Sequence, residues 1–108
     1  MPTLTNPPDL DEHSHLEDSQ DWNEDVACWL AEQEHIVLSK AHWEVIYFFR
    51  NFYAKHHAIP ATRLLVKAIA EQLGVEKGNS IYLQQLFPTS LPRQACKIAG
   101  LPKPARCM

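Results

Sequence analysis

The 108 residues are 45% hydrophobic and 21% charged, a balance that excludes a disordered chain and favours one ordinary globular domain. The formal net charge of -3 gives no general attraction to DNA or to an anionic membrane surface. No apolar run is long enough to cross a bilayer, and the start, Met1 to Pro8, lacks the features of a signal peptide. The sequence therefore predicts a cytoplasmic protein.

The beginning of the chain differs in composition from the rest. Residues 1–20 are rich in proline, aspartate, glutamate and serine, with little periodicity, and we expect a polar, loosely attached lead-in there. Residues 21–99 carry the apolar periodicity of a helical domain. Residues 100–108, which hold two prolines, predict a mobile C-terminal arm because proline cannot continue a helix.

Two helices are expected in the first half of the domain. The spacing of Trp22, Val26, Trp29 and Leu30 predicts a helix from about residue 23 to 34, with Asp21 available as its N-cap. Ser39 then precedes the longest periodic segment, residues 40 to about 57. That segment holds so many aromatic side chains that we expect it to be the central core helix.

Three shorter helices follow. Pro60 is expected in the first turn of a helix that ends near Leu73, with Gly74 as its left-handed C-terminal residue. A fourth helix carries apolar residues from Tyr82 to Phe87, and a fifth spans about residues 92–98. Since no segment alternates over the length of a strand, the sequence predicts a mainly α fold, a compact orthogonal bundle of about five helices.

Cys107 is the penultimate residue of the chain and the first candidate for chemistry. Arg106 beside it and Lys103 four residues back favour a thiolate, whereas the terminal carboxylate opposes one. A thiol near its reference pKa of about 8.5 is a few per cent ionised at neutral pH, which suffices for attack on a persulfide or disulfide. The alternative is an incidental cysteine in a tail.

The other two cysteines are open to more than one interpretation. Ten residues lie between Cys96 and Cys107, and closing such a loop with a disulfide contributes about 3 kcal/mol on a chain-entropy model. A transient disulfide is thus physically reasonable, but Cys96 also fits a small apolar residue on the inner face of a helix. Cys28 is expected to be a core or near-surface thiol.

Other kinds of site find little support in the sequence. Arg63, Lys77, Lys97 and Lys103 could form a basic patch around the arm for an anionic sulfur species, although solvated charges are the commoner explanation. No Cys-x-x-Cys or His-Glu-x-x-His occurs, and the three glycines form no phosphate-binding loop. We therefore expect neither a metal nor another cofactor.

Several motifs in fixed order resemble the DsrC/TusE family of sulfur-relay proteins. They are the tail from Gln94 to Pro104 with Cys96, the penultimate Cys107, the loop from Glu76 to Ser80, and the segments Leu86-Phe87-Pro88, Pro60 to Arg63 and His42-Trp43. The resemblance runs from about Trp22 to the end of the chain. It implies a helical fold with a small N-terminal β-hairpin and a C-terminal arm whose penultimate cysteine, here Cys107, carries sulfur as a persulfide.

The resemblance also implies partners. In the TusE branch, the cysteine receives sulfur from a TusBCD-like complex and passes it to an MnmA-like tRNA thiouridylase. In the DsrC branch, a second cysteine, at the position of Cys96, acts with the terminal one in the redox chemistry of dissimilatory sulfite reductase. We take a sulfurtransferase acting as a carrier in tRNA thiolation as the first hypothesis and the sulfite-reductase role as the second.

A third hypothesis comes from the residues alone. Short helices joined by turns around Pro60 and Gly74 can imitate a helix-turn-helix, but the acidic charge balance weighs against DNA binding.

Overall fold

A computed structural model describes residues 7–102 of the chain. Within this range the fold is five α-helices in the order α1 (Glu24–Gln33), α2 (Lys40–His56), α3 (Thr62–Leu73), α4 (Ser80–Leu86) and α5 (Leu91–Ile98), preceded by the short 3-10 turn η1 (Ser19–Asp21). The described residues form no β-strand. The mainly α prediction is confirmed, and none of these helices is long and apolar enough to cross a bilayer.

The helices begin and end for local reasons that the sequence largely supplies. The side chain of Asn23, not of Asp21 as predicted, caps α1 by accepting a hydrogen bond from the Val26 N–H. Gly74 ends α3 with φ 107°, a positive value that favours glycine, as predicted. α3 begins at Thr62, so Pro60 lies before its first turn.

From residue 7 to η1, the described chain forms a tight turn in place of the hairpin with strands that the family resemblance implies. A single antiparallel bridge joins Leu10 to Leu16, and the Asp11 carboxylate closes the turn by accepting from the backbone N–H groups of His13 and His15. His15 and Leu16 are buried, with 1% and 3% of their surface exposed. The polar lead-in expected here thus has two residues, His15 and Leu16, that pack into the fold.

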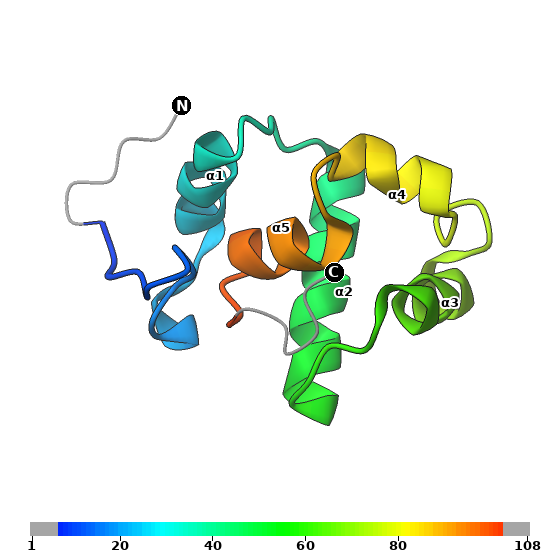
Figure 1. The fold of residues 1–108 in the computed structure, drawn as a ribbon, viewed down its shortest axis with the longest axis horizontal. Coiled ribbons are helices and arrows are strands. Elements are labelled where there is room, and N and C mark those ends of the chain that lie inside the picture. The colour runs from blue at the N-terminus through cyan, green and yellow to red at the C-terminus, as the bar shows by residue number, and fades with distance from the viewer. Residues whose placement is uncertain (1–6, 103–108) are drawn as a thin grey trace.

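The most buried helix is α5, whereas the sequence pointed to the long aromatic helix α2. Every residue of α5 except Arg93 is buried, and α5 contacts α1, α2 and α4. Figure 1 shows it in the middle of the molecule, in front of α2 and beside α1. The helix that carries Cys96 is thus the centre of the packing, and α2, which contacts it, buries Val45, Ile46 and Phe49 in the same core.

Candidate functional site

Cys96 lies in the second turn of α5, and its side chain has no exposed surface. Leu101 N–H donates to the Cys96 carbonyl oxygen at 2.9 Å, and Gly100 N–H donates to the Lys97 carbonyl oxygen at 3.1 Å. These two bonds, with Gly100 at φ 74°, form the Schellman motif that ends the helix. Cys107, Arg106 and Lys103, which the sequence also predicts as site residues, lie outside the described residues.

A carboxylate from another helix lies beneath α5. Glu34, the C-cap of α1, accepts from Arg93 Nη2 at 2.8 Å, Lys97 Nζ at 2.9 Å and Gln94 Nε2 at 3.1 Å. Burial by itself would raise the pKa of Glu34, but these three donors outweigh it and hold the pKa at about 2. One carboxylate therefore pairs with both cations, Arg93 and Lys97, of the helix that carries Cys96.

Three side chains meet at the point where the chain leaves α5. Trp22 Nε1 donates to the Ile98 carbonyl at 2.8 Å, Arg50 Nη1 to the Ala99 carbonyl at 2.6 Å, and His15 Nδ1 bonds the Leu101 carbonyl at 2.9 Å. We call His15, Trp22 and Arg50 the exit cluster.

The exit cluster is also held together internally. The guanidinium of Arg50 lies 4.1 Å from the centre of the Trp22 ring, within cation–π range. Burial lowers the pKa of His15, which keeps the imidazole neutral and makes Nδ1–H the donor to Leu101. The last carbonyls of α5, which a surface helix would leave to water, are thus bonded to protein.

The described members of the predicted basic patch are engaged separately. Lys97 is buried and pairs with Glu34, so its ammonium is directed away from solvent. Lys77 pairs with Glu44 of α2 at 2.6 Å, a bond that raises the pKa of the lysine. Arg63 lies exposed on α3. Within residues 7–102, then, Lys77 and Lys97 serve two different ion pairs.

Cys28 and His42 offer little reactivity. Burial, followed by the charges of Asp25 and Glu24, raises the pKa of Cys28, which makes it a weaker nucleophile than an ordinary thiol. His42 Nε2 bonds the Leu86 carbonyl and burial lowers the pKa of this histidine, so it links α2 to α4 as a neutral ring. The described residues contain no cluster of His, Cys, Asp or Glu suited to a metal ion.

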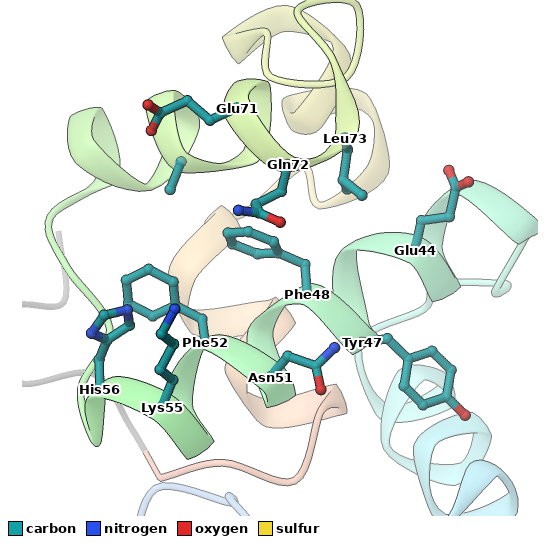
Figure 2. Close-up of a pocket in the computed structure, with 11 residues that line it drawn as sticks. Glu44, Tyr47, Phe48, Asn51, Phe52, Lys55, His56, Glu71, Gln72 and Leu73 are labelled. Carbon is teal, nitrogen blue, oxygen red and sulfur yellow. The ribbon is translucent and has the colours of Figure 1, made fainter.

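An open groove of about 470 Å³ lies between α2 and α3. Figure 2 shows Phe48 and Phe52 of α2 facing Gln72 of α3 across it. A second cavity, of about 230 Å³, lies between α3, α4 and the start of α5 and has no titratable side chain in its lining. Neither lining includes a cysteine, so neither cavity brings together the predicted site residues Cys96 and Cys107.

The sequence as a whole matches one family model. The model described as "DsrC like protein" matches residues 5–108, nearly the full chain. The chain belongs to the DsrC-like family. This confirms the resemblance drawn from the tail and loop motifs.

Relatives within the family carry two kinds of name. The chain is 56% identical to the "Sulfurtransferase TusE homolog" of Haemophilus influenzae and 53% identical to "Sulfurtransferase TusE" of Photorhabdus laumondii, covering 93% of this chain and 92% and 90% of those relatives. Among solved structures it resembles DsrC of Allochromatium vinosum, with 44% identity, a TM-score of 0.82, and coverage of 92% of this chain and 88% of that one.

A second solved structure has a more specific title. It is the oxidized gamma-subunit of the dissimilatory sulfite reductase (DsrC) from Archaeoglobus fulgidus, 36% identical, with a TM-score of 0.80 over 94% of this chain and 92% of that one. The shared fold therefore spans relatives with both kinds of name.

Glu34 and the exit cluster were not predicted from the sequence. Trp22 was predicted on an apolar helix face, residue 34 at a helix end, and Arg50 only as part of the long segment from residue 40 to about 57. One signal was available: Gly100 at the end of α5 predicts a sharp turn, whose backbone groups need donors. Which side chains supply them depends on tertiary contacts up to 86 residues apart along the chain.

Proposed function

We propose that this protein is a sulfurtransferase that acts as a sulfur carrier, accepting persulfide sulfur on Cys107. The observation that carries the proposal is the 56% identity to a sulfurtransferase TusE homolog over 93% of the chain. The family match extends to residue 108 and so includes Cys107. Residues after Leu101 form, in this proposal, the arm that presents the thiol to partners.

The transfer needs no oxidant or reductant. The Cys107 thiolate attacks the outer sulfur of a donor persulfide, R–S–SH, so that a new S–S bond forms on Cys107 and the donor leaves as R–S⁻. Attack by an acceptor on the same outer sulfur repeats the exchange and returns Cys107 as a thiolate. From the protein, this chemistry requires only one ionised thiol that both the donor and the acceptor can reach.

The destination that we propose is the wobble uridine of tRNA, in the cytoplasm. The donor would be a TusBCD-like complex and the acceptor an MnmA-like thiouridylase. The support is the TusE name shared by relatives that are 50% to 56% identical to this chain. A net charge of -3 fits a carrier that meets proteins rather than one that binds tRNA itself.

A second candidate function is that of a DsrC-like partner of dissimilatory sulfite reductase. It is favoured by the fold shared with the A. fulgidus gamma-subunit and by the presence of Cys96. In this chemistry the Cys96 thiolate attacks the inner sulfur of the Cys107 persulfide, forming a Cys96–Cys107 disulfide and releasing HS⁻. Cys96 must then become accessible, because its side chain has no exposed surface.

The experiment combines sulfur loading with two matched substitutions. The reduced protein is incubated with glutathione persulfide and its mass is measured; we expect a gain of one sulfur atom in the wild type. Cys107→Ser should remove the gain, and its persistence would contradict the proposal. If Cys107 acts alone as the carrier, Cys96→Ser should still gain one sulfur atom. If the two-cysteine reaction operates, this variant should no longer release HS⁻.

A further inference from the structure

Side chains bond the carbonyls at the end of α5 that most helix ends leave to water. Its own backbone already satisfies the carbonyls of Ala95, Cys96 and Lys97, through the N–H groups of Ala99, Leu101 and Gly100. The next carbonyls could bond water or be left at the surface, as at most helix ends. Instead, each of Ile98, Ala99 and Leu101 bonds a side chain of the exit cluster.

The donors of the exit cluster come from separate parts of the fold. His15 and Trp22 belong to the segment before α1, and Arg50 belongs to the middle of α2. Trp22 also lies where a side chain at position 100 would be, since a Cβ built there meets Trp22 Cδ1 at 2.5 Å. The backbone from Ile98 to Leu101 is thus fixed from several directions at once.

This fixed stretch is the root of the segment that carries Cys107. Cys107 follows Leu101 by six residues, so even a fully extended chain keeps the Cα of Cys107 within about 22 Å of the Cα of Leu101. A thiol confined to that volume meets a docked partner at an effective concentration in the millimolar range or above, and the value depends on where the tether starts. An anchor that defines the start therefore affects how often the sulfur reaches its target.

We propose that His15, Trp22 and Arg50 are positioning residues for sulfur transfer, because they hold Ile98, Ala99 and Leu101 and so fix the origin of the Cys107 arm. They act through the backbone and do not touch the sulfur. The inference rests on the proposed function only in assigning a sulfur cargo to Cys107. The placement of the arm can be measured without any sulfur transfer.

The measurement is a distance distribution between two spin labels, determined by pulsed electron paramagnetic resonance on the full chain. One label is placed on Cys107 and the other on Ile81→Cys of α4, which is 70% exposed, in a background with Cys28→Ser and Cys96→Ala. If the fixed stretch ends at Leu101, six residues lead to Cys107, and if it ends at Ile98, nine do. The reach of a chain grows with its length, so loss of the anchors should widen the distribution, by at most a factor of about 1.5.

Two matched pairs of variants separate anchoring from general stability. His15→Leu removes the donor to Leu101 and should widen the distribution, whereas His15→Asn retains an N–H donor and should keep it narrow. Arg50→Met should widen it, whereas Lys55→Met, which removes an exposed charge from the same helix, should not. Melting temperatures by circular dichroism establish that every variant is folded at the temperature of measurement.

The outcomes decide between positioning and a structural role. Distributions in His15→Leu and Arg50→Met that superimpose on the reference background, even with lowered melting temperatures, would overturn the proposal, as would equal widening in His15→Asn and His15→Leu. Loading of wild-type Cys107 by glutathione persulfide is measured separately. Absence of loading would defeat the proposed function and leave the positioning result standing.

Discussion

The two helices α3 and α5 are held in the fold in opposite ways. α3 has twelve residues and buries only Leu65 and Ile69, while Leu64 beside them is 58% exposed. α5 has eight residues and buries all but Arg93, including Gln94 and Lys97. α3 is attached by an apolar stripe, and α5 is enclosed by groups that must also satisfy its polar atoms.

This difference shows that burial of a polar helix needs specific partners. Lys97 could not lie 4% exposed without a carboxylate, because an unpaired buried ammonium costs several kcal/mol. Glu34 supplies that carboxylate from α1. An apolar stripe can pack against many kinds of apolar side chain, whereas the polar side chains of α5 need specific partners. We therefore expect α5, the helix that leads to Cys107, to be more sensitive to substitutions around it than α3.

Glu34→Gln is expected to cause the largest loss in the free energy of unfolding, because it removes the carboxylate that α5 depends on. The amide keeps the shape of the side chain but loses its negative charge. The positive charges of Lys97 and Arg93 on α5 then lie close together with no negative charge to compensate them. Breaking such an ion pair from one side costs about 3 to 4 kcal/mol of unfolding free energy. Urea unfolding monitored by tryptophan fluorescence measures the change.

The matched control for Glu34 is the surface pair of Lys77 and Glu44. Their side chains are 34% and 30% exposed, compared with 12% for Glu34 and 5% for Lys97. Glu44→Gln should leave the free energy of unfolding close to that of the wild type, because solvent screens exposed pairs. Similar small losses in both variants would mean that Glu34 does not stabilise α5 as argued.

Ile69→Ala tests the attachment of α3 and should have the next largest effect. Ile69 has no exposed surface, and removal of its side chain deletes half of the buried stripe of that helix. We expect a loss of about 2 to 3 kcal/mol, towards the lower end for such a truncation because a peripheral helix can shift into the gap. The same urea titration measures it.

Leu64→Ala on the same helix is the control, and it should stay within about 0.5 kcal/mol of the wild type because Leu64 is mostly exposed. Equal losses at positions 64 and 69 would contradict the single-stripe description of α3.

The contrast also explains what could be predicted from the sequence. α3 was predicted to within its first turn, because apolar periodicity and the glycine at position 74 are local signals. The existence of α5 was predicted for the same reason. Its central place was not, because a helix with Arg93, Gln94 and Lys97 looks half-exposed until Glu34, some 60 residues away, is seen to pair with them.

The candidate site follows the same division. Cys96 and Cys107 stay predictions, made from their positions in the chain and from the family motifs that surround them. The exit cluster was not predicted. In the sequence, Trp22 fits the apolar face of a helix and Arg50 fits the surface of a helix, and neither pattern indicates a bond to the end of α5. His15 was hidden in an acidic segment whose composition predicted loose attachment, although the turn at Asp11 brings this histidine to Leu101.

Gly100→Ala should have a smaller effect, concentrated at the end of α5. The alanine must adopt φ 74°, which costs about 1 kcal/mol, and its Cβ would lie 2.5 Å from the Trp22 ring, so the ring must move. We expect a total loss of about 2 kcal/mol in urea unfolding. In a Trp22→Ala background the same substitution should cost only the backbone contribution, and strictly additive losses would refute the contact.

The pH dependence of stability should show the smallest effect, and its sign follows from two buried histidines. Burial lowers the pKa values of His15 and His42 in the folded protein from 6.5, so the unfolded chain binds more protons near that pH. Their contribution is therefore complete above about pH 6.5 and is lost as the pH falls through the lowered values. Glu34 acts in a separate window, below pH 4.5, because its pKa is about 2.

Urea unfolding at pH 7.5, 6.0 and 5.0 measures the histidine window apart from that of Glu34. The wild type should lose stability steadily across the three values. His15→Asn/His42→Gln, whose amides place a donor near the positions of His15 Nδ1 and His42 Nε2 but do not titrate, should lose less. An equal slope in the wild type and the double variant would mean that these two rings take up protons without cost, which the burial of His15 argues against.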